Sequence, residues 1–213
     1  TLNVIYDGSG VTVAVVDSGI DANHPDLENR ILSSVNFVSS SAFAGDKWGH
    51  GTHVAGIIAA VINNNLGVAG IAGGSSILPC KVADSGGTMY FSYIQNALYW
   101  AADNGARVAN LSYGGAAGSS SVASAASYMN SKGGVVMVAA GNDNKDYGYG
   151  NYASLFVAGA TTSGDGKASY SSFGRFVDIA APGSGIYTTS RSGGYSSHRS
   201  RSTSRSRTQM SRP

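Results

Sequence analysis

Short apolar runs alternate with segments of helical character along most of this 213-residue chain. Residues 11–16, Val-Thr-Val-Ala-Val-Val, are rich in β-branched side chains, which is typical of a strand buried on both faces. Because strands that alternate with helices form parallel sheets, we predict an α/β fold with a mostly parallel central sheet and helices on both faces. The predicted strands are residues 11–16, 77–82, 108–111, 135–140, 155–158 and 176–179, and the predicted helices are residues 51–61, 91–102 and 119–131.

Charge divides the chain into two parts. Residues 1–190 hold eight Lys and Arg against twelve Asp and Glu, whereas residues 191–213 hold six Arg and no acid. The second part is mostly Ser, Arg, Gly and Thr without apolar periodicity, so its composition predicts a low-complexity, disordered segment. The asymmetry indicates a basic tail joined to an ordinary domain, and the first part is long enough for one domain with a buried core.

Neither a membrane anchor nor a disulfide is expected. No run of eighteen apolar residues occurs, so we predict no transmembrane helix. The first residues show neither the basic nor the apolar part of an export signal, which is therefore either absent or already removed. Cys80 is the one cysteine, which excludes an internal disulfide, and its place in the apolar run 77–82 predicts a buried structural thiol.

A histidine stands between two glycines at Gly49-His50-Gly51, directly before an apolar, alanine-rich segment. Glycines let the backbone turn and approach a ligand closely. A helix that begins here holds His50 near its N-terminal end, at the rim of a cleft, where an imidazole can accept and return protons near neutral pH. Histidines such as His50 and His53 more often have no catalytic role when no partner residues support them. The hypothesis that His50 transfers protons therefore depends on residues elsewhere in the chain.

Polar residues close three of the predicted strands. Asp17 follows the first strand, Ser112 the third, and Asn142 the fourth. Because open α/β sheets bind ligands at the carboxyl ends of their strands, we expect these side chains beside His50 at one edge of the sheet. A carboxylate can hold an imidazole in one tautomer, the imidazole can activate a hydroxyl, and an amide can donate to a developing oxyanion. Each residue alone would more often be a solvated loop acid or a turn residue, whereas together they predict nucleophilic catalysis.

Five motifs in order make the chain resemble the subtilisin-like serine proteases, the subtilases. They are VVDSGI at 15–20, GHGTHVAG at 49–56, NLSYGG at 110–115, AAGN at 139–142 and APG at 181–183. The resemblance implies a subtilisin-like three-layer fold, with residues 1–190 as the catalytic domain and 191–213 as an atypical C-terminal segment. It also implies that Asp17 orients the imidazole, that His50 is the general base and Asn142 the oxyanion donor, and that His53 faces the core.

The resemblance further implies that an extended peptide pairs with two strand edges. These edges are Gly87-Thr88-Met89 and Ser112-Tyr113-Gly114, while Ala139-Ala140-Gly141 lines a roomy first pocket. No acid or base marks this pocket in the sequence, so we expect apolar or neutral side chains at P1, the substrate residue before the scissile bond. Phe91 would close an apolar outer pocket, the alternative being ordinary helix packing.

A structural calcium site is another implication of the resemblance. Hard cations take about six to eight oxygens, often including carbonyls of a tight loop. The asparagine-rich turn over 63–65 is the loop in question, although it would equally serve to end a helix. The implied ligands are the side chains of Asp26 and Asn64 and the carbonyls of Ile62, Leu66 and Val68.

The chain departs from the family at the nucleophile. The motif Gly-Thr-Ser-Met-Ala-Pro does not occur. Counting from Pro182 places the family's serine at Ser202, whose neighbour Arg201 replaces a small residue. A second alignment, over 207–213, matches more of the pattern but puts Gln209, which cannot act, at the nucleophile's position. The chain also stops where family members continue with a core helix, whose loss would expose apolar surface on the sheet.

Three explanations of the C-terminal segment are open. The C-terminal residues are wrongly determined or incomplete, the gene is frameshifted or truncated, or the chain is a genuine inactive relative. We favour the first, because residues up to 190 keep the features that catalysis needs.

We therefore predict a secreted serine endopeptidase with an Asp-His-Ser triad, Ser202 being the serine that length favours. It would act as a monomer on peptide or protein substrates, without nucleic-acid or membrane partners. The alternative is a catalytically inactive subtilase-fold protein that binds peptides. A third hypothesis assigns RNA binding to the Arg/Ser-rich segment, because arginines contact phosphates, but the acidic body of the chain does not favour it.

Overall fold

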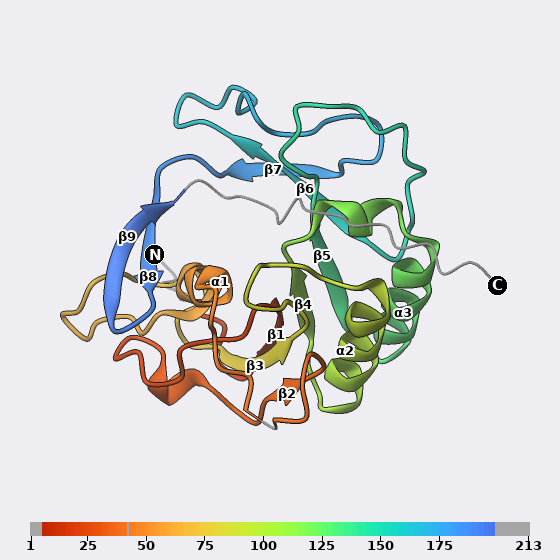
Figure 1. Cartoon of the computed structure of the whole chain (residues 1–213). Coiled ribbons are helices and arrows are strands. Elements are labelled where there is room, and N and C mark those ends of the chain that lie inside the picture. Colours follow the sequence, from red (N-terminus) through yellow and green to blue (C-terminus); the bar gives the residue numbers. More distant parts are fainter. Residues whose placement is uncertain (1–5, 42, 199–213) are drawn as a thin grey trace.

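The computed structural model describes residues 6–41 and 43–198. Within this part of the chain, seven strands form one sheet in the order β2-β3-β1-β4-β5-β6-β7, and all neighbouring pairs are parallel. This sheet, with its helices, confirms the predicted α/β class, and β8 and β9 form a separate antiparallel hairpin (Figure 1). The strands are β1 Thr12–Asp17, β2 Val35–Asn36, β3 Ser76–Lys81, β4 Val108–Leu111, β5 Val135–Ala139, β6 Phe156–Thr161, β7 Ile179–Pro182, β8 Ile186–Ser190 and β9 Gly194–His198. The helices are α1 His50–Ala59, α2 Phe91–Asp103 and α3 Ser120–Ser131, with short 3-10 helices η1 Glu28–Arg30 and η2 Gly114–Gly118.

Strand β1 divides its side chains between the two faces of the sheet. Ala14 and Val16 are fully buried in the larger of two apolar clusters, whereas Val15 is fully buried in the smaller one. Because side chains alternate along a strand, Asp17 shares the face of Val15. Helix α1 covers this face, so the alternation directs Asp17 toward the helix that begins at His50.

Helices α2 and α3 lie side by side on the face of the larger cluster (Figure 1). Helix α2 buries Ile94, Leu98 and Ala101, the residues whose spacing predicted one apolar face. Helix α3 begins after Ser119, whose hydroxyl accepts the N–H of Val122 at 3.4 Å and so caps the helix. The pair packs against β1, β3 and β5 and covers that side of the sheet.

Helix α1 covers the opposite face only beside β1 and β3. There, Ala55 and Ala59 share the smaller cluster with Val15 and Ile77. Along β4 to β7 the same face borders a cavity of about 700 Å³. Parallel sheets are normally covered on both faces. Within the described residues, however, no helix covers this half of the sheet on the side of α1. Its apolar lining includes Val108, Met137, Ala158, Ala160 and Ile179.

The β8–β9 hairpin packs against α1 instead of joining the sheet (Figure 1). The hydroxyls of Thr188 and Thr189, both fully buried, donate to the carbonyl oxygens of His53 at 2.9 Å and Thr52 at 2.7 Å. Gly56 permits this approach, because a Cβ there would lie 2.1 Å from Thr189 Oγ1. The hairpin therefore fixes the position of the helix that carries His50.

The hairpin includes residues 191–198, so the prediction of disorder was wrong for this part of the Arg/Ser-rich segment. The Nε2 atom of the buried His24 lies 2.9 Å from the carbonyl oxygen of Gly194, and its ring meets Tyr195 edge-on at a centroid distance of 5.2 Å. The N–H of Ser192 donates to Asp21 at 2.8 Å. These partners lie far away in the sequence, and the local composition contains no information about them.

Most predicted elements agree with the structure to within one or two residues, and the exceptions are the last strands of the sheet. The strand predicted over 176–179 was wrong, because β7 begins at Ile179 and Phe176 is a buried core residue before it. Strand β6 continues three residues past the predicted end at 158. Cys80 is fully buried, as predicted, and burial raises its pKa.

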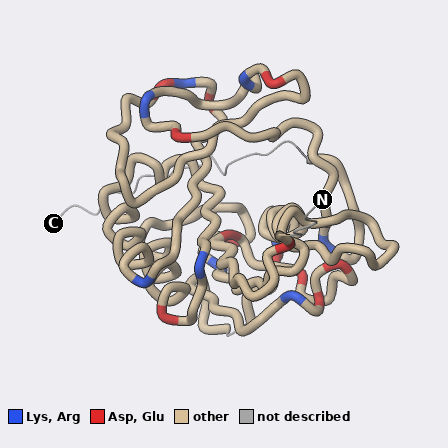
Figure 2. Tube along the Cα trace, turned by 180° about the vertical axis from the view of Figure 1, so that it is seen from behind, with Lys and Arg blue, Asp and Glu red and all other residues tan. Residues whose placement is uncertain are grey.

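Among residues 6–41 and 43–198, no helix is both long enough and apolar enough to span a bilayer. Figure 2 shows Lys and Arg interspersed with Asp and Glu along the described backbone.

Candidate active site

Asp17, at the end of β1, meets His50, the first residue of α1. The Nδ1 atom of His50 lies 2.9 Å from each carboxylate oxygen of Asp17. Asp17 is fully buried, and the His50 side chain is 15% exposed. A carboxylate only accepts hydrogen bonds, so Nδ1 carries the hydrogen and the Nε2 atom of the neutral ring carries the lone pair. This is the geometry of an acid that orients a general base.

Backbone groups fix Asp17 from two directions. The N–H of Ser18 donates to Asp17 Oδ1 at 2.7 Å. The carbonyl oxygen of Asp17 accepts the N–H groups of Val82 at 2.8 Å and Ala83 at 3.2 Å, just past the end of β3. Because a buried carboxylate is unfavourable without partners, these bonds and the imidazole together hold the Asp17 side chain in place.

Trp48 lies over the imidazole and was missed by the sequence reasoning. Its ring stacks on His50 with a centroid distance of 5.0 Å and an interplanar angle of 25°. The indole also lies against Gly87, where a Cβ would be 2.9 Å from the Trp48 ring. Trp48 is 38% exposed and forms one wall beside the base. In the sequence, the available signal for this contact was an aromatic residue two positions before the histidine.

Asn142 lies at the same edge of the sheet as Asp17, because β5 is separated from β1 only by β4. It is half-buried and, with Ser112 and Asn110, borders the cavity described above. Gly141 has a φ of +106°, a left-handed conformation that a side chain would strain. The structure therefore brings the predicted oxyanion donor and the Ser112 segment to one cavity, with the Asp17–His50 pair at the β1 end of the same edge.

The two predicted substrate edges follow β3 and β4. In the first edge, Asp84 accepts the N–H of Thr88 at 2.9 Å, and Met89 is buried in an antiparallel bridge with Ala83. The second edge starts at Ser112 and continues into η2. Phe91, at the start of α2, is 41% exposed, and its ring lies 5.8 Å from that of Tyr113. Phe91 thus joins the two predicted edges and leaves part of its ring exposed.

Two stacked tyrosines lie beside the segment 139–141 of the predicted first pocket. The rings of Tyr147 and Tyr149 are 4.9 Å apart with only 6° between their planes. Tyr149 packs against Gly118 of η2, where a Cβ would lie 2.6 Å from the ring. A Cβ on Gly141 would lie 3.7 Å from the Tyr147 ring. The stack therefore extends from η2 to the residue that follows β5 and lies beside the segment 139–141.

The carboxylate of Asp143 contacts this stack. The Tyr147 hydroxyl donates to Asp143 Oδ2. Burial and this hydrogen bond raise the pKa of Tyr147 to about 12, so the hydroxyl remains a donor at neutral pH. The sequence analysis singled out neither Asp143 nor Tyr147. The available signal was the tyrosine-rich stretch over 147–152, directly after the Asn142 motif.

The predicted calcium ligands Asp26 and Asn64 come together. Asp26 is fully buried, and its Oδ1 lies 2.5 Å from the side-chain amide nitrogen of Asn64. The N–H of Val68 donates to Asp26 Oδ2 at 3.3 Å, and the N–H of Leu66 donates to Asn64 Oδ1 at 3.0 Å. Burial and the neighbouring Asp26 raise the pKa of Tyr195 to about 12, so its hydroxyl stays protonated at neutral pH.

These residues fit a cation in part. Within residues 6–41 and 43–198, no Lys or Arg forms an ion pair with the buried Asp26 carboxylate, a situation that a bound cation would relieve. The same described ranges contain no cluster of three or more acidic, His or Cys side chains of the kind that binds metals. Most oxygens would therefore have to come from the loop carbonyls of Ile62, Leu66 and Val68.

The predicted nucleophile, Ser202, lies outside the described residues, as does Gln209 of the second alignment. The described residues include the predicted acid, base and oxyanion donor and the two predicted substrate edges.

Comparison with known proteins identifies the class. The sequence profile of the subtilase family matches residues 8–212. Thermitase of Thermoactinomyces vulgaris is 44% identical over 195 residues, which are 91% of this chain and 70% of that protein. A crystal structure of a cold-adapted subtilisin-like serine proteinase superposes with a TM-score of 0.82 at 33% identity and covers 95% of this chain and 74% of that one. The chain therefore belongs to the subtilase family and is a subtilisin-like serine endopeptidase.

The length covered differs between relatives. Subtilisin of Bacillus pumilus is 42% identical over 91% of this chain, which spans 72% of that protein. The thermophilic serine proteinase of Bacillus sp. strain AK1 is 39% identical over 88% of this chain, which spans 47% of that relative.

Proposed function

We propose that this chain is the catalytic domain of a secreted, monomeric serine endopeptidase that cleaves peptide bonds in peptides or proteins. Asp17, His50 and Ser202 form its triad, and Asn142 is its oxyanion donor. The observation that carries the proposal is the contact between His50 Nδ1 and the buried Asp17 carboxylate at 2.9 Å, which holds one tautomer of a general base. Family membership supports a serine as the nucleophile and a location outside the cell.

The chemistry follows from the two ring nitrogens of His50. The Nε2 atom takes the proton of Ser202 Oγ as that oxygen attacks the substrate carbonyl carbon. Asp17 stabilises the imidazolium that forms, and the Asn142 amide donates to the oxyanion. The imidazolium then protonates the leaving amine as the peptide bond breaks. Water, deprotonated by His50 Nε2, then attacks the acyl carbonyl carbon, and the imidazolium returns that proton to Ser202 Oγ as the ester bond breaks.

Substrate binding uses the edges Gly87–Met89 and Ser112–Gly114, between which an extended peptide adds main-chain hydrogen bonds. The small residues 139–141 favour an apolar or neutral side chain at P1. We further propose that the Tyr147–Tyr149 stack limits the size of that side chain; the support is that Tyr147 lies next to Gly141 and Tyr149 packs against Gly118.

Tyr147→Ala is expected to raise the ratio of kcat/KM for a phenylalanine P1 substrate to that for an alanine P1 substrate about tenfold. The reason is that added pocket volume favours the larger apolar group by the amount that a few methylenes contribute. Initial rates on two peptides that differ only at P1 measure the ratio. The control is Tyr99→Ala, which removes a partly exposed tyrosine of α2. An unchanged ratio would exclude Tyr147 from the pocket.

We also propose that Asp26, Asn64 and the loop carbonyls of Ile62, Leu66 and Val68 bind a structural calcium ion. Calcium at about 100 times its Kd should add about 2.7 kcal/mol to the free energy of unfolding. Thermal unfolding with calcium and with a chelator measures this difference. Asp26→Asn should abolish the calcium dependence, and Asp165→Asn, in an exposed turn, should keep it. Equal melting temperatures for the parent chain in both buffers contradict the site.

The decisive experiment for the proposed function is labelling with a serine-directed covalent phosphonate, followed by intact-mass and peptide mapping. We expect one adduct per chain, located on Ser202 and absent from the His50→Ala and Ser202→Ala variants. A chain that binds peptides in a fluorescence titration but acquires no adduct would instead be an inactive, peptide-binding subtilase. The missing nucleophile motif is the observation that favours this second candidate.

A further inference from the structure

One carboxylate, that of Asp46, joins the two chain segments that carry the acid and the base. Its Oδ1 accepts the hydroxyl of Ser18 at 2.9 Å, and its Oδ2 accepts the N–H of Thr52 at 3.0 Å and the Thr52 hydroxyl at 2.7 Å. Ser18 directly follows Asp17, and Thr52 lies two residues after His50. Asp46 therefore connects the end of β1 to the first turn of α1 through charge-assisted hydrogen bonds.

Helix α1 depends on this connection because it has no N-cap side chain of its own. Its N-cap residue is Gly49, with a φ of +105°. The first N–H groups of a helix need partners from outside the helix. Here the N–H of Gly49 donates to Asp46 at 2.7 Å and the N–H of Gly51 donates to Ser18 Oγ at 2.9 Å. A negative charge is also favourable at this end of a helix, so Asp46 stabilises the turn that holds His50.

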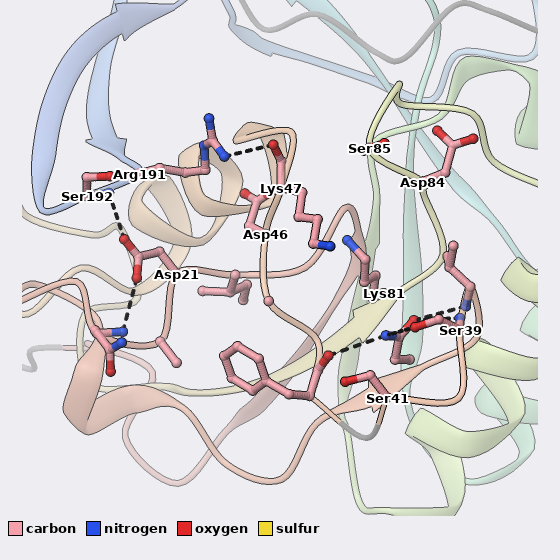
Figure 3. A pocket seen from close by; sticks show the side chains of 17 residues that line it. Asp21, Ser39, Ser41, Asp46, Lys47, Lys81, Asp84, Ser85, Arg191 and Ser192 are labelled. Atoms are coloured by element: carbon pink, nitrogen blue, oxygen red, sulfur yellow. Dashed lines mark hydrogen bonds between the residues drawn. The ribbon is translucent and has the colours of Figure 1, made fainter.

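Lys81 adds a third link from β3. Its ammonium group donates to the carbonyl oxygen of Ser18, and the residue is only 6% exposed. Burial lowers the pKa of Lys81, and the nearby Asp46 and Asp17 act in the opposite direction. Asp46 and Lys81 both border a pocket of about 580 Å³ (Figure 3). Ser18 is thus held by an anion at its hydroxyl and by a cation at its carbonyl.

We propose that Asp46 is a positioning residue: it sets how His50 meets Asp17, and through this contact the rate of proton transfer. Asp46 acts through Ser18 and the first turn of α1 rather than on the reacting atoms. The kinetic consequence depends on the proposed function, whereas the structural consequence for the Asp17–His50 contact does not.

The test compares Asp46→Asn with Asp165→Asn, which makes the same charge change in an exposed turn. An asparagine keeps the shape of Asp46 but turns one acceptor into a donor that faces the N–H groups of α1. We expect kcat to fall about 10- to 100-fold, the effect of a slightly misplaced catalytic group, with KM changed less than twofold. The proton resonance of His50 Nδ1–H, which reports its bond to Asp17, should shift upfield in Asp46→Asn and stay in place in Asp165→Asn.

A second variant, Ser18→Ala, keeps the proposal testable if the Asp46→Asn chain does not fold. Ser18→Ala removes the link on the Asp17 side together with the acceptor of the Gly51 N–H, and it leaves the bonds from Asp46 to Gly49 and Thr52 in place. We expect it to shift the His50 resonance in the same direction, by a smaller amount. Combined with Asp46→Asn it should add little further loss of kcat, because both changes break the same connection.

The proposal is overturned if a folded Asp46→Asn chain keeps both kcat and the His50 Nδ1–H resonance of the parent. It is also overturned if only KM changes, or if the losses in Ser18→Ala and Asp46→Asn simply multiply. A parent chain that hydrolyses no peptide would refute the proposed function alone, and the resonance comparison would still decide the role of Asp46.

Discussion

Asp17→Asn should lower kcat/KM about 10⁴-fold, a magnitude carried over from replacements of the triad acid in subtilisin and other serine proteases. The carboxylate accepts the His50 Nδ1–H with both oxygens at 2.9 Å. An asparagine can direct its NH₂ group at Nδ1, which places the ring hydrogen on Nε2, and a ring with that tautomer cannot take a proton from the serine. Because Asp17 is fully buried, water cannot restore the missing acceptor.

Steady-state hydrolysis of a chromogenic peptide measures this effect, with thermal unfolding of both chains to show that the variant folds. Asp165→Asn serves as the control for the loss of one negative charge. A decrease of less than tenfold in a folded Asp17→Asn chain would mean that Asp17 does not orient the base, despite the contact.

Asn142→Ala should lower kcat about 10²- to 10³-fold, which corresponds to about 3 kcal/mol of transition-state stabilisation. This magnitude comes from the corresponding subtilisin asparagine and is not specific to this structure. The physical reason is that the amide donates to an oxyanion that exists only in the transition state, so the ground-state complex loses little. KM should therefore change less than threefold.

The matched control is Asn151→Ala, which removes an asparagine whose amide donates to Asp178 at an exposed site. Progress curves over a range of substrate concentrations separate kcat from KM in both variants. A rise in KM with kcat unchanged would assign Asn142 to substrate binding in place of oxyanion stabilisation.

The parts of the site that the sequence predicted are those with local patterns. The run over 11–16 predicts a buried strand, and period-two alternation then fixes which face Asp17 shares with Val15. Glycines stand beside His50 and Asn142 in the sequence, and the structure shows that Gly49 and Gly141 have left-handed backbone conformations. Local periodicity and backbone chemistry were sufficient to bring the acid and the base together.

The parts that the sequence did not predict depend on contacts between distant segments. The stack of Tyr147 on Tyr149 reaches from η2 to the end of β5 only because Gly118 and Gly141 leave room for it. Asp46 has no distinctive neighbours in the sequence, and its partner Ser18 lies 28 positions away. Composition likewise predicted disorder for residues 191–198, whose order comes from partners such as His24.

The docking of the β8–β9 hairpin has a consequence for the biosynthesis of the enzyme. Thr188 and Thr189 bind carbonyls of α1 that are 135 and 137 positions earlier in the chain. A nascent polypeptide that ends before these threonines can form the strands around Asp17 but lacks the clamp on the helix of His50. Because contacts over such long separations form slowly, we expect His50 to reach its final position late in folding.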